Sequence, residues 1–203
     1  MLRGTLLGLL ELVAPRGCPG CDDDLSADDP GPFCPACLPL LEPLGRGPAA
    51  YGYGGPLAVA LRRLKYDARI DLVAPLAELL KGAGLAHAGH VDAVACVPLH
   101  RRKRRRRGFH AVELMAAPLA DALGVPLDTR RLTRLRDTPP QASLPQRDRD
   151  ANVRGAFDAG PGPARVLLVD DVRTTGATLR AASGALYRAG AKRVRLLALA
   201  GVR

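Results

Sequence analysis

The sequence predicts an α/β protein in which helices flank a parallel sheet, with a small metal-binding unit at the N-terminus. Short apolar segments suited to buried strands alternate with segments of helical periodicity, which is the pattern of a parallel sheet covered on both faces. The chain has 203 residues, 47% of them hydrophobic, so one sizeable core is feasible. Four of the five cysteines lie within residues 18–37. We therefore expect an N-terminal unit over residues 1–47 and a larger domain over residues 48–203.

The first fifteen residues are apolar enough to raise the question of a secretory signal. Glu11 interrupts the apolar stretch, and Arg16 stands where small residues would precede a cleavage site, so we reject that interpretation. The apolar residues recur at helical spacing, which favours an amphipathic helix docked on the body of the protein over a helix lying on a membrane surface. They are Leu2, Leu6, Leu9, Leu10 and Val13. No apolar run reaches the roughly 18 residues of a membrane span, and we expect a cytoplasmic protein.

The clustered cysteines form two CxxC pairs. They are Cys18, Cys21, Cys34 and Cys37. A tight hairpin between the pairs would bring four thiolates into the tetrahedral arrangement that Zn²⁺ prefers, so we predict a structural zinc ribbon. Two disulfides or free thiols are the alternative, weakened by the rejected export signal. A site closed by four sulfur ligands has no position for a reactive water, so this metal is expected to stabilise the fold and not to catalyse.

The order of elements in the larger domain follows from periodicity. Residues 42–55 are rich in Pro, Gly and Ala and are interpreted as a linker. Asp71 is a plausible cap for the second helix, and Cys96 is expected to be an unreactive, buried strand residue. The expected helices are 56–66, 71–81, 109–123 and 177–189, and the expected strands are 91–98, 166–169 and 194–200.

The segment 165–179, RVLLVDDVRTTGATL, carries the most chemical information. An apolar strand over residues 166–169 runs into Asp170 and Asp171, and a small, hydroxyl-rich turn then leads into a helix. Ligands of open parallel sheets bind beyond the carboxyl ends of the strands, where this turn must lie. Backbone N–H groups and hydroxyls of the turn suit a phosphate, and the two acids are acceptors for sugar hydroxyls. The turn residues are Thr174, Thr175, Gly176, Ala177 and Thr178.

These features together predict a site for a sugar phosphate. A Walker loop fits poorly because no Gly-Lys-Ser/Thr ending is present, and one glycine cannot make a dinucleotide fingerprint. Two acids after a strand can also simply cap a helix or face solvent. The prediction therefore depends on the strand, the acids and the turn occurring together.

The phrase VLLVDDVRTTGAT resembles the signature of type I phosphoribosyltransferases, which bind 5-phosphoribosyl 1-diphosphate through two adjacent acids and a Thr/Gly phosphate turn. Four further motifs, in the same order, resemble the ComF (ComFC) family of zinc-ribbon-bearing proteins associated with natural competence. They are LKY at Leu64–Tyr66, VPLHRRK at Val97–Lys103, RGF at Arg107–Phe109 and TPPQASLPQRDRDANVRGAF at Thr138–Phe157. One departure is that the family usually reads Gly-Phe-Asn-Gln where this chain has Gly-Phe-His-Ala at residues 108–111.

The resemblance implies a type I phosphoribosyltransferase fold and transfer of a phosphoribosyl group to an unknown acceptor, with Mg²⁺ as cofactor. Asp170 and Asp171 would be the catalytic residues. The implied substrate-binding residues are Lys65, His100, Arg101, Arg102, Lys103, Arg173, Thr174, Thr175, Gly176, Ala177 and Thr178. Members that act on 6-oxopurines usually have an acid where this chain has Thr174, which argues against such an acceptor. Amines, other nucleobases or no acceptor at all stay open.

The charge pattern supports an alternative. Residues 101–107 supply seven of the ten net positive charges, and such a run repels itself unless an anion meets it. Arg104, Arg105, Arg106 and Arg107 are candidates for binding single-stranded DNA in a non-catalytic competence factor that retains the pocket. Aromatic platforms for stacked bases are scarce, with no Trp, three Phe and four Tyr. The ribbon is also a candidate docking surface for DNA-uptake proteins, and residues 138–157 are interpreted as either a lid or a surface loop.

Overall fold

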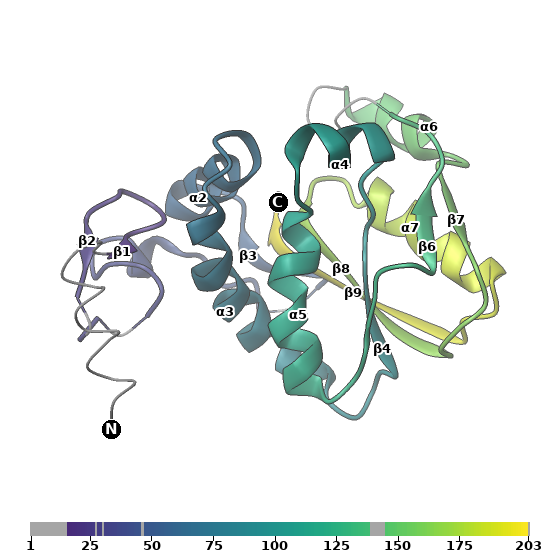
Figure 1. Ribbon diagram of the computed structural model, residues 1–203, viewed down its shortest axis with the longest axis horizontal. Helices are drawn as coiled ribbons and strands as arrows, with labels where there is room; N and C mark the ends of the chain where they lie inside the picture. The colour runs from purple at the N-terminus through teal and green to yellow at the C-terminus, as the bar shows by residue number, and fades with distance from the viewer. Residues whose placement is uncertain (1–15, 27, 30, 46, 139–144, 203) are drawn as a thin grey trace.

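The computed structural model describes residues 16–202 except 27, 30, 46 and 139–144 (Figure 1). The amphipathic helix expected over residues 1–15 lies outside the described residues. None of the helices in the described part of the chain combines the length and the apolar character needed to cross a bilayer.

A five-stranded sheet forms the centre of the larger domain, and every pair of neighbouring strands in it is parallel. Its strands in spatial order are β3 (Ala49–Gly52), β9 (Arg193–Gly201), β8 (Arg165–Arg173), β4 (Ala93–Cys96) and β5 (Leu127–Asp128). Val169 pairs with Cys96 on one side and with Leu197 on the other, so the carboxyl ends of the central strands share one edge. The predicted parallel sheet is confirmed.

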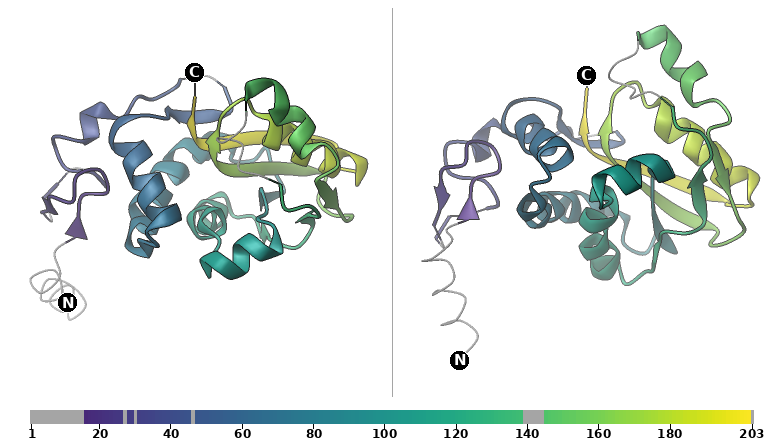
Figure 2. Two further views of the ribbon diagram at one scale, coloured as in Figure 1. Left: turned by 90° about the horizontal axis from the view of Figure 1, so that it is seen from above. Right: turned by 45° about the horizontal axis from the view of Figure 1, so that its top comes forward.

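Helices cover both faces of this sheet (Figures 1 and 2). On one face lie α2 (Gly55–Tyr66), α3 (Val73–Gly84) and α5 (Ala111–Leu123), and on the other lies α7 (Ala177–Arg188). Along β8, Leu167 and Val169 pack in the first core, whereas Val166 and Leu168 pack in the second. Because both faces are buried here, residues 166–169 of β8 are uninterruptedly apolar.

The helices predicted from periodicity are present, and Cys96 is buried in β4 as expected. Asp71, however, does not cap α3. It lies in the 3₁₀ turn η2 (Ile70–Leu72), and its carboxylate accepts hydrogen bonds from Arg69. The chain enters α3 directly from this turn, so Leu72 takes the cap position.

The linker interpretation of residues 42–55 is also wrong in part, because β3 lies within it and pairs with β9. A Cβ atom added at Gly201 would lie 2.6 Å from the Cβ of Ala49. The two strands approach so closely here that only small residues fit. The same small residues gave the segment its linker-like composition.

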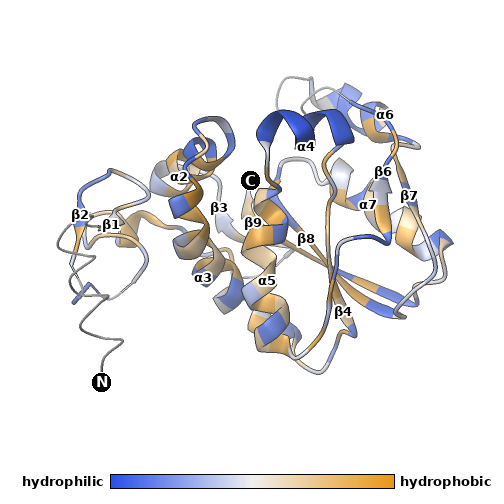
Figure 3. Cartoon of the chain, viewed as in Figure 1, coloured by the Kyte–Doolittle hydropathy of each residue, from blue (hydrophilic) through white to orange (hydrophobic). Residues whose placement is uncertain are grey.

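Shorter elements surround the carboxyl edge of the sheet. The helix α4 (Arg101–Arg107) follows β4 and is the most hydrophilic helix in Figure 3. An antiparallel pair, β6 (Leu132–Arg134) and β7 (Phe157–Ala159), packs beside α7, as does α6 (Arg149–Val153).

The cysteine-rich unit is built on a two-stranded hairpin, β1 (Arg16–Gly17) and β2 (Asp24–Leu25), followed by the 3₁₀ turn η1 (Leu38–Leu40). Cys18 and Phe33 are fully buried and belong to the same apolar cluster as Leu57 and Leu61 of α2. The unit is therefore packed directly against α2, as Figure 1 shows.

Candidate functional site

A cavity of about 580 Å³ opens at the carboxyl edge of the sheet. Its wall combines residues from β8 and the following turn with residues from α2, α4, α5 and β6. Ligands of open parallel sheets bind at this edge. This cavity is therefore the candidate functional site.

Asp170 and Asp171 both line the cavity, but they lie inside β8 and not after it. The strand expected over residues 166–169 is therefore too short, since Asp170, Val172 and Arg173 continue the ladder with β9. The chain turns only after Arg173. The long partner strand β9 supplies carbonyl and N–H groups for these extra residues, which an apolar count of β8 alone could not reveal.

The two carboxylates interact with each other and with a lysine. The Nζ of Lys65, near the end of α2, lies 2.8 Å from Oδ1 of Asp171, and both side chains are largely buried. The backbone N–H of Asp171 donates to Oδ1 of Asp170 at 2.9 Å. Burial, followed by repulsion from Asp171, raises the pKa of Asp170 from 3.8 to about 8. For Lys65, burial opposes the charged form, but the two carboxylates more than offset it and raise its pKa.

The turn after β8 leads from the sheet edge into the N-terminus of α7 (Ala177–Arg188). Gly176 has φ of +79°, a conformation that favours glycine, and α7 begins at the next residue. Thr174, Gly176 and Thr178 line the cavity, whereas Thr175 and Ala177 are not among the described residues of its wall. The hydroxyl of Thr175 instead accepts from the backbone N–H of Ala177 at 3.4 Å. The N-terminus of a twelve-residue helix thus faces the cavity, where the helix dipole favours an anion.

The basic run folds as the helix α4. Its cap is His100, whose Nδ1 accepts from the N–H of Arg102 at 3.4 Å, and it ends at Gly108 with φ of +80°. Lys103, Arg106 and Arg107, which share one helix face, line the cavity. His100 is not among the described residues of the wall, and neither are the other four members of the run, Arg101, Arg102, Arg104 and Arg105. The structure divides the run by helix face and not by order along the chain.

Two further cavity residues carry charge and were missed by the sequence reasoning. They are Arg62 on α2 and Arg134 on β6. Arg134 lies over the ring of Phe157, 5.3 Å from its centroid, and burial lowers its pKa. Its Nε has no hydrogen-bond partner among the described residues, although the guanidinium donates to the hydroxyl of Thr138. No local motif marks either arginine, because only the tertiary fold brings them to the cavity.

His110 stands where the ComF pattern usually has an asparagine, and it also lines the cavity. It caps α5: its Nδ1 accepts from the N–H of Glu113 at 3.0 Å. Burial lowers the pKa of His110, which favours the neutral ring that a cap acceptor requires. The tyrosines Tyr53 and Tyr66 complete the side of the cavity nearest α2.

The balance of charge defines what this cavity attracts. Seven cationic side chains and two carboxylates line its described wall. The cations are Arg62, Lys65, Lys103, Arg106, Arg107, Arg134 and Arg173. A concave site with such an excess of positive charge concentrates polyanions. The two carboxylates in its wall supply oxygen atoms of the kind that Mg²⁺ prefers.

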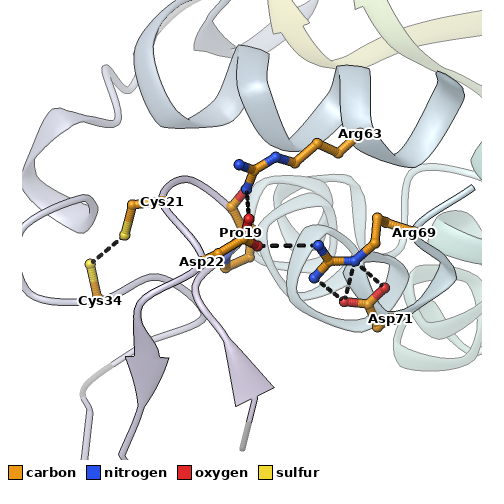
Figure 4. A network of polar contacts seen from close by, with 7 residues as sticks. All are labelled: Pro19, Cys21, Asp22, Cys34, Arg63, Arg69 and Asp71. Carbon is orange, nitrogen blue, oxygen red and sulfur yellow. Dashed lines mark hydrogen bonds and ion pairs between the residues drawn. The ribbon is translucent and has the colours of Figure 1, made fainter. Parts of the chain in front are cut away.

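The four cysteines of the N-terminal unit form a second candidate site. Their sulfur atoms all lie within 4.8 Å of one another, and the thiols are free of disulfides. The Sγ atoms of Cys21 and Cys34 are 3.6 Å apart (Figure 4). Burial opposes ionisation of Cys18, but hydrogen bonds from backbone N–H groups, first that of Cys34, lower its pKa to about 7. Four convergent thiols, one of them readily ionised, could hold a Zn²⁺ ion.

The chain is similar to proteins named for DNA utilization and competence. The DNA utilization protein YhgH of Salmonella typhi is 34% identical over 192 residues, which cover 90% of this chain and 82% of that protein. YhgH of Escherichia coli K12 is 33% identical over 174 residues, covering 82% of this chain and 76% of that protein. Competence protein F of Haemophilus influenzae is 30% identical over 158 residues, covering 73% and 69%. No family model matches the chain.

Two solved structures align in part. A glutamine phosphoribosylpyrophosphate amidotransferase from B. subtilis, complexed with ADP and GMP, aligns with a TM-score of 0.44 and 26% identity over 66% of this chain. The aligned part is 29% of the amidotransferase, so this chain spans less than a third of that protein. An adenine phosphoribosyltransferase aligns with a TM-score of 0.34 and 15% identity, covering 63% of this chain and 68% of that one.

Proposed function

Since the chain belongs to the ComF family, that of DNA utilization protein YhgH and competence protein F, we propose that it is a phosphoribosyltransferase linked to DNA uptake. Its donor substrate is 5-phosphoribosyl 1-diphosphate with Mg²⁺. The N-terminal unit is a structural zinc ribbon. The donor is an anion with a monophosphate at one end of a ribose and a diphosphate at the other, and the cavity has matching groups for each part.

The observation that carries the proposal is the meeting of three kinds of group in one cavity: paired carboxylates, a Thr/Gly turn at a helix N-terminus, and a ring of cations. The turn at residues 174–178 binds the 5-phosphate through its N–H and hydroxyl groups. Asp170 and Asp171 accept hydrogen bonds from the ribose hydroxyls. Lys103, Arg106 and Arg134 lie on the elements facing the turn and bind the diphosphate.

The reaction breaks the bond between C1 of the ribose and a diphosphate oxygen, and the bonding electrons leave with the diphosphate. A lone pair of the acceptor then forms the new bond at C1. The cationic wall stabilises the negative charge that grows on the departing group, and the carboxylate of Asp171 stabilises the positive charge that grows on the ribose ring. When bound, Mg²⁺ supplies further positive charge to the departing diphosphate.

Lys65 has a specific task in this scheme. Its ion pair with Asp171 partly neutralises the charge of that acid beside Asp170, whose raised pKa favours the protonated form at neutral pH. Thr174 provides no base at neutral pH, which disfavours a 6-oxopurine acceptor. An acceptor whose nucleophilic atom needs no base to free its lone pair fits better.

A direct test is isothermal titration with 5-phosphoribosyl 1-diphosphate and Mg²⁺, followed by an acceptor screen. The variant Asp170→Asn/Asp171→Asn keeps the size of both side chains and removes their charge, and we expect it to lose Mg²⁺-dependent binding. Asp148→Asn/Asp158→Asn removes two exposed carboxylates outside the described cavity wall and is the matched control. Equal binding by the two double variants would refute the site assignment.

The outward face of α4 favours a second function, binding of single-stranded DNA. Arg102 and Arg105 are exposed and are not in the described cavity wall, whereas Lys103 and Arg106 are. We expect Arg102→Gln/Arg105→Gln to weaken DNA binding and to reduce its salt slope by about 1.4, since each neutralised phosphate contributes about 0.7. Lys103→Gln/Arg106→Gln removes the same charge and should weaken phosphoribosyl diphosphate binding more strongly. Indistinguishable effects of the two variants on both ligands would show that the helix faces have no separate roles.

A further inference from the structure

We propose that Asp22, in the first cysteine knuckle, is a positioning residue that couples the metal site to the substrate cavity by clamping the turn that ends α2. The inference rests on the proposed function for its ligand, and on the geometry of the clamp for its mechanism. The position of Asp22 follows directly from the knuckle. It succeeds Cys21, adopts a left-handed conformation with φ of +68°, and donates its N–H to the carbonyl of Cys18 at 2.9 Å.

The carboxylate of Asp22 holds two arginines that lie on either side of one turn (Figure 4). Its Oδ2 lies 2.9 Å from Nη1 of Arg63, and its Oδ1 lies 3.2 Å from Nη1 of Arg69. Arg63 also donates to the carbonyl of Pro19 inside the knuckle at 3.5 Å. Arg69 is oriented by Asp71, which accepts from it at 2.8 Å. Knuckle and turn are thus joined at both ends of residues 63–69.

The clamped turn contributes directly to the cavity. Between the two arginines, Lys65, Tyr66 and Ala68 all line the cavity wall, and Lys65 carries the ion pair with Asp171. Arg63 and Lys65 lie two residues apart on α2, so they project to different sides of the helix, one toward the knuckle and the other toward the acids. A shift of the knuckle is therefore transmitted to the lysine by less than one helical turn.

The backbone of the turn depends on the clamp. The carbonyl of Arg63 accepts from the N–H groups of both Asp67, at 2.9 Å, and Arg69, at 3.4 Å. Ala68 between them has φ of +54°, which is unfavourable for a residue with a Cβ. A turn that contains such a residue persists only where its surroundings hold it. The ion pairs of Asp22 with Arg63 and Arg69 hold it from outside the turn.

The neighbouring packing ties Asp22 to the metal. A Cβ at Gly20 would lie 3.1 Å from Sγ of Cys37 and 2.5 Å from Cβ of Pro56, so the knuckle is pressed between the other cysteine pair and the start of α2. The four thiols fit Zn²⁺, and Asp22 directly follows one of them. Closing the thiols around the ion fixes the knuckle, and with it Asp22. By linkage, if metal binding raises the affinity of the cavity for its ligand, ligand binding raises the affinity of the cysteines for the metal by the same factor.

The clamp is tested first without substrate. Hydrogen exchange of the backbone amides of Asp67 and Arg69 is measured in zinc-loaded wild type, Asp22→Asn and Asp24→Asn, which removes the same charge from the same hairpin. Because the ion pairs of Asp22 are partly exposed, we expect about threefold to fivefold faster exchange in Asp22→Asn. Asp24→Asn should match wild type, and Asp22→Glu should restore part of the protection. Equal exchange in Asp22→Asn and Asp24→Asn overturns the proposal.

The coupling to the cavity is tested by titrating the same proteins with 5-phosphoribosyl 1-diphosphate and Mg²⁺, with zinc content measured in parallel. We expect about threefold to fivefold weaker binding in Asp22→Asn, a larger loss after zinc is removed by chelation, and little change in Asp24→Asn. The side chain of Arg63 is not a metal ligand, so Arg63→Gln should weaken donor binding as Asp22→Asn does while retaining about one zinc per chain. The double variant Asp22→Asn/Arg63→Gln should bind the donor no more weakly than either single variant. Wild-type exchange in zinc-loaded Arg63→Gln overturns the clamp. If wild type itself does not bind the donor, the proposed function fails, and the exchange measurements still decide the clamp.

Discussion

Replacing Asp170 by asparagine should stabilise the protein at alkaline pH while it abolishes binding at the cavity. Asp170 is held beside Asp171 in a poorly solvated wall, and burial with this repulsion raises its pKa from 3.8 to about 8. Between these two values the folded protein retains a proton that the unfolded chain releases. Stability therefore falls as the pH rises from about 4 to about 8, by at most about 1.4 kcal/mol per pH unit for this group. An asparagine side chain at this position would carry no such charge, and its amide oxygen can still accept the N–H of Asp171.

The expected gain follows from the same shift. A rise of about four pKa units sets a ceiling of about 6 kcal/mol at pH 8, and relaxation of Lys65 and Asp171 leaves an expected gain of about 2 kcal/mol. Urea unfolding of wild type and Asp170→Asn at pH 4, 6 and 8 measures the difference, which should be near zero at pH 4 and largest at pH 8. Asp158→Asn, an exposed acid on β7, is the control and should show no such trend. A difference that is flat with pH, or that favours wild type at pH 8, would refute the assignment of a strained acid pair.

Three further changes probe other parts of the structure. Cys34→Ser should lose zinc and lower the urea midpoint, because the ion's binding free energy is part of the folding free energy; metal analysis that finds about one zinc per chain would contradict this. Gly84→Ala should cost about 1–3 kcal/mol of unfolding free energy, since its Cβ would lie 2.4 Å from a methyl group of Leu119, whereas Gly82→Ala in the same helix has open space and should gain about 0.5–1 kcal/mol. Arg131→Leu should cost about 2 kcal/mol by thermal or urea unfolding, because the buried guanidinium donates to two backbone carbonyls of the loop before β8; an unchanged midpoint would show that these bonds contribute nothing net.

Three central strands of the sheet, β4, β8 and β9, were predictable because each contains a continuous apolar segment, whereas β3 and β5 were missed. The four large helices were predictable because their apolar residues recur at helical spacing. The segments that the sequence concealed are those whose stability comes from elsewhere. Strand β3 is a short AAYG segment whose Ala49 fits closely against Gly201 of β9, and nothing in its own pattern distinguishes it from a loop. The extension of β8 through Asp170 and Asp171 is polar, and it is a strand only because β9 continues beside it. A strand that is stabilised by a partner far along the chain cannot be recognised from its own short sequence.

The candidate site divides in the same way. Asp170, Asp171 and the turn could be found because a strand, two acids and small hydroxyl residues follow one another directly. Arg134 reaches the cavity from β6, whose partner strand β7 lies more than twenty residues further on, so no local spacing reveals it. Arg62 sits on a helix that was predicted correctly, yet periodicity says which face of that helix is apolar and not what its polar face meets.

The helix α4 shows why charge, too, must be interpreted through the fold. Seven consecutive cations include basic residues at the helix N-terminus, where the helix dipole disfavours them, and like charges one turn apart repel. Two contacts relieve part of this: Arg104 bonds Glu113 at 3.0 Å, and Lys103 donates to the carbonyl of Thr138 at 2.7 Å. The ends are fixed by the His100 cap and by Gly108. A helix held by its caps and neighbours against its own repulsion gains stability when an anion arrives. Binding of a polyanion to either face should therefore protect the amides of α4 from hydrogen exchange. Protection confined to the turn at residues 174–178 would show that α4 takes no part in binding.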